Sequence, residues 1–283
     1  MPRGVPKSGV RNRKSAADRI AAVKVSYEPV SHETDAQIDE RIADRFEILD
    51  VLAEACTVGN ARALIVSGPA GLGKSYTIEK RLNDWDPSEL NHTVVKGYVR
   101  PTGLVKLLYS YRHAGNVIVF DDADAIFFDD VSLNLLKAVC DTTERRRVSW
   151  LSEGSLIDEE SGERVPRSFD FDGTIIFISN YDFDAMIDRG HKLAPHLAAL
   201  VSRAHYIDLA MKSRRDYLVR IRQVIKQGLL SGLTTNQEDD VIKFIDNNHS
   251  RLRELSLRMA LKLGALRKQG GHWEKLANVT CCK

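Results

Sequence analysis

The residues best suited to chemistry lie in one segment, Gly68-Pro69-Ala70-Gly71-Leu72-Gly73-Lys74-Ser75. The segment matches G-x-x-x-x-G-K-[ST], a pattern whose backbone N–H groups surround phosphate oxygens. Glycine is required because it lacks a Cβ and lets the backbone approach the phosphates closely. We expect Lys74 to present a positive charge to the β- and γ-phosphates and the Ser75 hydroxyl to ligate Mg²⁺. The segment therefore predicts a site for a nucleoside triphosphate, which we extend to Tyr76.

The sequence on either side of this segment predicts the elements that position it. Residues 63–67 form a short apolar run, typical of a buried strand, and a helix is predicted after Ser75. Such a helix directs the positive end of its dipole toward the same phosphates. The alternative is a glycine-rich turn that happens to precede a lysine, and the strand–turn–helix context disfavours it.

A second chemical element is an apolar run at 117–120 that ends in two carboxylates, Asp121 and Asp122. In a parallel sheet the carboxyl ends of the strands meet on the ligand side. We expect Asp121 to lie near Mg²⁺, directly or through water, and Asp122 to polarise the attacking water as a general base. The alternative is an aspartate pair that caps a helix. We expect Asp124 and the later pair Asp129 and Asp130 to cap a helix or to be solvated.

Helical and strand patterns alternate over the first three quarters of the chain. Thr34 and Gln37 form a possible capping box, ahead of apolar residues that recur at steps of three and four as far as Cys56. Strands are predicted at 93–96, 117–120, 174–179 and 205–209, and helices at 102–112, at 131–143 and up to about Arg203. This alternation predicts a parallel α/β sheet with helices on both faces.

Two segments depart from that alternation. Residues 145–172 are polar and punctuated by Gly154, Gly162 and Pro166, which favours a hairpin insertion. After residue 209 only helical patterns occur, with a cap expected at Thr235 and Glu238 and a third helix at 251–268. We therefore predict a parallel-sheet P-loop NTPase domain at 27–209, followed by a small all-helical lid domain at 210–283.

Composition excludes several classes of protein. The chain has 283 residues, of which 43% are hydrophobic, so it can bury a core. No apolar run approaches the roughly 20 residues of a membrane helix, and no secretory signal is visible at the N-terminus. Four scattered cysteines form neither a disulfide framework nor a zinc site. We expect a cytoplasmic protein without a membrane partner, in the host cytoplasm if a phage encodes it.

The charge of the chain is uneven. Residues 1–25 contain seven basic residues and one acidic residue, a net charge of +6, which leaves −4 for the remainder of a chain with net charge +2. We predict a basic, flexible tail at 1–26. The tail can contact nucleic-acid phosphates, or it can simply be solvated, since the body of the chain is mildly acidic.

These features together resemble the AAA+ ATPase family, and in particular the AAA+ proteins often encoded by tailed bacteriophages. The resemblance covers roughly residues 27–270. It implies ATP and Mg²⁺ as cofactors and ATP hydrolysis at subunit interfaces of a homo-oligomer, a ring or partial ring that is hexamer-like. The sequence departs from the family at Asp122, where the family usually has glutamate. That carboxylate is one methylene shorter, which affects the placement of the water and the rate of hydrolysis.

The resemblance also assigns roles to further residues. Asn180 matches the first sensor position, which holds the lytic water, although asparagine is also a common turn residue. Ser202 and Arg203 resemble the element that presents an arginine finger to the neighbouring subunit. Alternatively, Arg203 interacts favourably with the dipole at a helix C-terminus. Arg189 is a second, less well-placed candidate for the arginine finger. Arg258 resembles the second sensor arginine on a lid helix that carries many bases. Residues 27–30 match the stretch that lines the adenine pocket.

The macromolecule on which such a motor acts is predicted from its pore-facing loop. The resemblance places Lys96, Tyr98 and Arg100 there; the aromatic side chain suits a polypeptide and the basic ones suit nucleic acid. Basic residues at 145–147 with Trp150 suit single-stranded nucleic acid, although nearby acidic residues almost cancel their charge.

We predict an oligomeric ATPase that remodels or loads a macromolecule in DNA or RNA metabolism, acting on nucleic acid or a replication protein. A protein-remodelling ATPase that grips a polypeptide substrate is the alternative. An ATP-dependent scaffold with little turnover is the second alternative.

Overall fold

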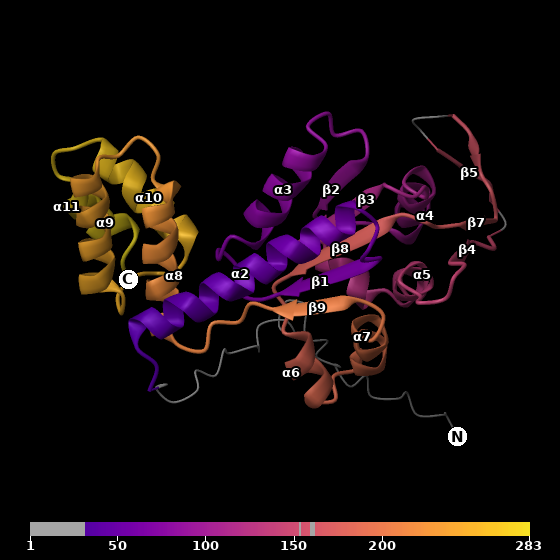
Figure 1. The fold of residues 1–283 in the computed structure, drawn as a ribbon, viewed down its shortest axis with the longest axis horizontal. Coiled ribbons are helices and arrows are strands. Elements are labelled where there is room, and N and C mark those ends of the chain that lie inside the picture. The colour runs from indigo at the N-terminus through magenta and orange to yellow at the C-terminus, as the bar shows by residue number, and fades with distance from the viewer. Residues whose placement is uncertain (1–31, 153, 159–161) are drawn as a thin grey trace, which may run out of the picture.

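The computed structural model describes residues 32–152, 154–158 and 162–283 (Figure 1). The predicted tail at 1–26 and the predicted adenine-pocket stretch at 27–30 lie outside these residues. The main sheet has five strands in the order β2-β3-β8-β1-β9, and all its pairs are parallel. Its strands are β1 (Ala63–Ser67), β2 (His92–Lys96), β3 (Val117–Asp121), β8 (Thr174–Ser179) and β9 (His205–Asp208). The predicted parallel α/β sheet is confirmed.

Helices cover both faces of this sheet, because both faces of the central strands are apolar. Leu64 and Val66 of β1 pack with helices α2 (Asp35–Thr57) and α3 (Lys74–Trp85). Ile65 of the same strand belongs to the core on the opposite face. That core includes α4 (Pro101–Ser110), α5 (Asp130–Val139), α6 (Phe183–Asp188) and α7 (Ala194–Val201).

Local signals explain where several of these helices begin and end. The capping box expected ahead of α2 is present, since Thr34 Oγ1 accepts from the Gln37 N–H at 3.3 Å and Gln37 Oε1 accepts from the Thr34 N–H at 2.8 Å. The helix predicted at 131–143 ends at Val139, whose carbonyl accepts a bond from Arg146 Nη1 at 2.8 Å. The single helix expected to end near Arg203 is two helices, separated at Gly190, which has φ +64°.

The predicted hairpin insertion consists of two short antiparallel pairs. Strand β4 (Arg147–Ser149) pairs with β7 (Ser168–Asp170), and β5 (Leu156–Ile157) pairs with β6 (Arg164–Val165). A 3₁₀ turn, η1 (Asp124–Phe128), follows β3 on the way to α5.

The basic residues at the base of the insertion make structural contacts. Arg146 is buried and donates to the carbonyls of Val139 and Gly173 at 2.8 and 2.9 Å. Arg145 pairs with Asp170 at 2.8 Å, and the Trp150 side chain packs against the core. Arg146 and Trp150 attach the insertion to the sheet domain, and the Arg145 ion pair joins two parts of the insertion itself. These side chains therefore support the predicted nucleic-acid surface less than their sequence suggested.

A helical lid follows the sheet, as predicted. It contains α8 (Arg214–Val224), a π turn η2 (Ile225–Leu229), α9 (Thr235–Asn248), α10 (Leu257–Lys268) and α11 (Trp273–Thr280), packed around their own apolar core. The expected domain boundary at 209–210 falls between β9 and α8 and stays a prediction. Within the described part of the chain, no helix has the length and hydropathy to cross a bilayer.

Two details of the lid correct the sequence predictions. The cap expected at Thr235 and Glu238 lies one residue earlier, because Thr234 has the extended backbone and its Oγ1 accepts from the Gln237 N–H at 3.4 Å. The helix expected at 251–268 begins only at Leu257, where Ser256 Oγ accepts from the Met259 N–H at 3.1 Å.

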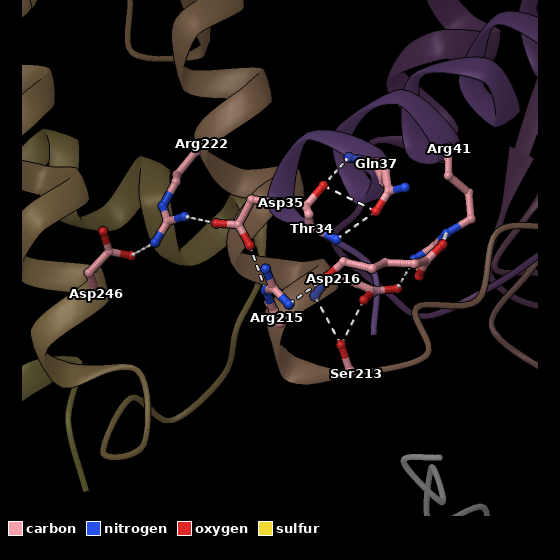
Figure 2. Close-up of polar contacts among 10 residues, drawn as sticks. Thr34, Asp35, Gln37, Arg41, Ser213, Arg215, Asp216, Arg222 and Asp246 are labelled. Atoms are coloured by element: carbon pink, nitrogen blue, oxygen red, sulfur yellow. Dashed lines mark hydrogen bonds and ion pairs between the residues drawn. The ribbon is translucent and has the colours of Figure 1, made fainter. Parts of the chain in front are cut away.

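An ion-pair network joins the start of α2 to the lid (Figure 2). Asp35 accepts from Arg215 Nε at 2.5 Å and from Arg222 Nη1 at 3.2 Å. Arg222 also donates to Asp246 of α9 at 2.8 Å. The lid is therefore tied to the same helix that covers one face of the sheet.

Candidate functional site

The predicted site residues gather at one edge of the sheet, where the carboxyl ends of the strands meet. Strand β1 leads directly into Gly68, β3 ends at Asp121, and Asn180 follows β8. Register explains their proximity, because Asp121 is paired with Ile178 and Ser67 with Ser179. Ligands of open α/β sheets bind at this edge, so the predicted phosphate loop and acidic pair occupy the expected place.

The loop has the backbone that its glycines allow. Gly71 and Gly73 have φ +76° and +99°, which side chains rarely adopt. A Cβ at Gly71 would lie 2.7 Å from Ser256 Cβ, and one at Gly68 would lie 3.2 Å from Leu209. Leu72 is 1% exposed and anchors the loop in the core. The start of α3 has no side-chain cap, so its first N–H groups suit an anion.

Lys74 is the central cation of the site. It is 5% exposed, and its Nζ donates to the Gly68 and Pro69 carbonyls at 2.5 and 2.9 Å and to Asn180 Oδ1 at 2.9 Å. Burial lowers the pKa of Lys74 to about 8, and nearby carboxylates, Asp122 foremost, oppose that shift. The ammonium group is therefore held at the base of the loop in a form that keeps most of its charge at pH 7.

Ser75 and Asp121 form the pair expected for a divalent cation. Ser75 Oγ donates to Asp121 Oδ1 at 2.9 Å. The described residues contain no group of three or more histidine, cysteine, aspartate or glutamate side chains that could hold a metal by themselves. A hydroxyl and one carboxylate nevertheless fit Mg²⁺, which commonly takes its remaining oxygens from substrate phosphates and water.

Lys96 contacts this pair, which the sequence did not predict. Its Nζ lies 3.4 Å from Asp121 Oδ2 and 2.7 Å from Glu79 Oε1. The hydrogen bond with Glu79 raises the pKa of Lys96. Lys96 was expected at a pore-facing loop, which stays a prediction, and its side chain contacts the expected cation site.

Asp122 and Asn180 complete the polar centre. Asn180 Nδ2 donates to Asp122 Oδ1 at 2.6 Å, while its Oδ1 accepts from Lys74. Asn180 therefore connects the lysine to the carboxylate and uses both ends of its amide. Asp122 has φ +53°, a conformation that costs free energy in a residue other than glycine and that recurs at functional sites.

Asp124 is a carboxylate whose environment the sequence reasoning missed. It was expected to cap or to be solvated, a role that Asp129 does fulfil by accepting from the Ser132 N–H at 2.7 Å. Burial raises the pKa of Asp124 to about 6, although hydrogen bonds from the Ser179 side chain and the Asn180 backbone lower it. Its spacing from Asp122 was visible in the sequence, but its burial was not.

A cavity of about 1000 Å³ lies between the loop, α2 and the lid. Its walls include Asp122, Asn180 and most of the loop, whereas Gly68, Pro69, Leu72 and Asp121 do not line it. The lid meets the loop directly, because the Leu257 N–H donates to the Gly71 carbonyl at 2.8 Å.

Side chains from the lid and from α3 complete this wall. Arg258 lines the cavity, and its charge is among those that lower the Lys74 pKa. Tyr76 is on the wall and is 71% exposed. Arg220 and Phe46 also line the cavity, and the sequence reasoning had singled out neither of them.

The other predicted residues lie outside the cavity wall. Arg203 follows α7, and its Nη1 donates to the Ala199 carbonyl at 2.8 Å. Its rival Arg189 is exposed at the end of α6. Tyr98 is 73% exposed and Arg100 is exposed, both in the loop between β2 and α4.

Comparison with known proteins identifies a relative. No family model matches the chain. A curated protein of Enterobacteria phage T4, described as an uncharacterized 36.7 kDa protein in the nrdC-mobD intergenic region, is 36% identical over 264 residues. The match covers 92% of this chain and 78% of the phage protein. The chain belongs to the family of this phage protein.

Solved structures with a similar arrangement share little sequence. A point mutant of Thermotoga maritima RuvB is 15% identical with a TM-score of 0.46, over 86% of this chain and 65% of that one. Brucella abortus NtrX, solved in complex with ATP, is 12% identical with a TM-score of 0.46, over 87% of this chain and 54% of that one. The chain thus spans less than two thirds of either protein.

The structure of this chain defines its fold class. The sheet order, the glycine loop after β1, the acidic pair at the end of β3, the asparagine after β8 and the helical lid match the P-loop NTPase fold that the sequence predicted. The phage T4 relative confirms the phage connection that the sequence predicted. The sheet and the lid confirm the predicted fold class.

Proposed function

We propose that this chain binds ATP with Mg²⁺ and hydrolyses it as an AAA+ ATPase. The proposal is supported chiefly by the hydrogen bonds that link the side chains of Lys74, Asn180 and Asp122. They lie beside the hydrogen-bonded pair of Ser75 and Asp121. These contacts join residues of three strand ends, and each has the chemistry that phosphoryl transfer requires.

Each side chain has a proposed role in that reaction. The loop N–H groups and Lys74 bind the β- and γ-phosphates, while Ser75 and Asp121 hold the cation. Bound Mg²⁺ would neutralise charge that develops on the phosphates. Asp122 acts as general base toward water, and Asn180 holds its carboxylate at 2.6 Å in one orientation. Because Arg258 reaches the same cavity from the lid, we assign it to the nucleotide as well.

We further propose that the active form is a homo-oligomer, a hexamer-like ring or partial ring. Arg203 supports this idea because it lies outside the cavity of its own chain, as a residue that completes a neighbour's site must. A guanidinium supplied in trans would stabilise charge on the transferring phosphoryl group.

The substrate proposal is a macromolecule in DNA or RNA metabolism, either nucleic acid or a replication protein. Exposed Arg100, Arg164 and Arg167 support it. A second candidate, remodelling of a polypeptide, is favoured by the 73% exposed side chain of Tyr98 beside Arg100. The ion pair of Arg145 and the burial of Arg146 reduce the support for nucleic acid at the insertion.

The test is phosphate release from ATP by the full chain, alone and with single-stranded DNA, double-stranded DNA, RNA or an unfolded protein. We expect turnover, which Asp122→Asn abolishes while ATP binding persists. Asp239→Asn, an exposed carboxylate on α9, is the matched control and should leave turnover unchanged. ATP binding without turnover in the unaltered chain would leave the scaffold alternative, and absence of binding would refute the proposal.

A further inference from the structure

Arg220 of α8 is a buried cation that faces the cavity without an acidic partner. Its side chain is among the buried polar groups, with 6% of the residue exposed. Nη1 donates to Gln223 Oε1 at 2.6 Å, and Nε and Nη2 lie 3.4 and 3.5 Å from the Leu72 carbonyl. No carboxylate in the described ranges forms an ion pair with it, and Asp39 acts only at longer range.

Such an arrangement is costly for the nucleotide-free protein. Buried charges are normally paired, because desolvation of an isolated ion is not offset by neutral hydrogen-bond acceptors alone. Burial accordingly lowers the pKa of Arg220 to about 10. The aromatic ring of Phe46, whose centroid lies 3.4 Å from Arg220 Cζ, supplies a cation–π contact but no counter-charge. An anion in the adjoining cavity would supply it.

The position of Arg220 indicates which anion that is. Its Nη2 lies 3.6 Å from the point that a Cβ on Gly73 would occupy, so it reaches the phosphate loop itself. It lines the same cavity as Lys74 and Arg258 but comes from a different lid helix than Arg258. Gln223, three residues further along α8, holds the guanidinium in this direction.

We propose that Arg220 binds a phosphate group of the nucleotide. The ion pair between this lid residue and the phosphate would then link the lid to the phosphate loop. The proposal rests on the nucleotide site proposed above and adds a phosphate ligand supplied by the first lid helix. The lid is then held against the loop more strongly with a phosphate chain in the cavity than without one.

The test is Arg220→Met, which keeps much of the apolar volume and removes the charge. We expect ATP and inorganic pyrophosphate each to bind roughly 10- to 100-fold more weakly, since a charged hydrogen bond of ordinary strength is lost. The unfolding temperature of the nucleotide-free variant should stay the same or rise, because an unpaired buried charge is gone. Arg222→Met, on the same helix but outside the cavity, is the control and should leave both affinities unchanged.

The outcomes separate this proposal from the one on which it rests. Unchanged affinity for ATP and pyrophosphate in Arg220→Met, with clear weakening in Lys74→Ala, would overturn only the role of Arg220. Weaker ATP binding with unchanged pyrophosphate binding would place Arg220 near the adenine base rather than at a phosphate. That result would also overturn the proposed phosphate contact. If the unaltered chain bound no ATP, both proposals would fail. Should Arg220→Met not fold, Arg220→Gln is measured in the same way. If the variant unfolded at a lower temperature than the unaltered chain without nucleotide, but lost no affinity for ATP or pyrophosphate, Arg220 would have a packing role and the proposal would be overturned.

Discussion

Replacement of Asp124 by asparagine should stabilise the nucleotide-free protein at neutral pH. The carboxyl group accepts hydrogen bonds from the Ser179 side chain and the Asn180 backbone, and burial raises its pKa from the ordinary 3.8 to about 6. At pH 7 the folded protein therefore holds a carboxylate that the unfolded chain solvates better. An asparagine of the same shape carries no charge and can still accept the hydrogen bonds that Ser179 and Asn180 donate.

The size of the effect follows from that pKa. The unfolded carboxyl loses its proton near pH 4 and the folded one near pH 6, so the stability of the unaltered protein falls as pH rises between these values. A shift of about two units at about 1.36 kcal/mol per unit amounts to about 3 kcal/mol. The variant should gain up to that amount at pH 7 and nothing below pH 4.

Urea unfolding of both proteins between pH 4 and pH 8 measures this difference directly. Asp239→Asn, on the exposed side of α9, is the control and should show no such trend. A difference in unfolding free energy between Asp124→Asn and the unaltered protein that stays constant across this pH range would contradict the prediction, because the effect of a buried charge must follow its titration.

Three further predictions test the loop and the lid. Gly71→Ala should lower both stability and ATP affinity, because the added Cβ would lie 2.7 Å from Ser256. Gly59 has nearly the same φ, but a Cβ there would meet no other atom, so Gly59→Ala should lower stability alone. ATP binding at pH 8.5 should take up about 0.7 proton at Lys74, measured by calorimetry in two buffers, and Lys74→Met should remove the uptake. Asp35→Asn should lower stability by about 0.5–1 kcal/mol in urea unfolding, an effect that 1 M NaCl suppresses.

The central elements could be predicted because local and global signals agree there. Strand β8 has an apolar centre and is buried along its whole length, so its bounds at 174–179 are as expected. The phosphate loop follows from a spacing whose chemistry leaves few alternatives. The start of α10 could not be placed from periodicity, because Leu252 and Leu255 continue the apolar spacing and only the Ser256 cap shows where the helix begins.

The residues missed in the site were those whose role depends on burial. Helix α8 carries Arg214, Arg215, Arg220 and Arg222, and composition alone does not tell which of them faces the cavity. Arg220 is three residues after buried Tyr217, and this helical spacing was a usable signal. Lys96 was assigned to a pore loop by resemblance, whereas parallel register with β3 places it opposite Asp121.

The most direct test of the nucleotide site is a crystal structure of the full chain with Mg²⁺ and a non-hydrolysable ATP analogue. We expect the triphosphate on the backbone amides between Gly68 and Ser75, with the ion held by Ser75 and Asp121. A structure with the analogue bound elsewhere, or with this cavity filled by protein side chains at saturating analogue, would contradict it.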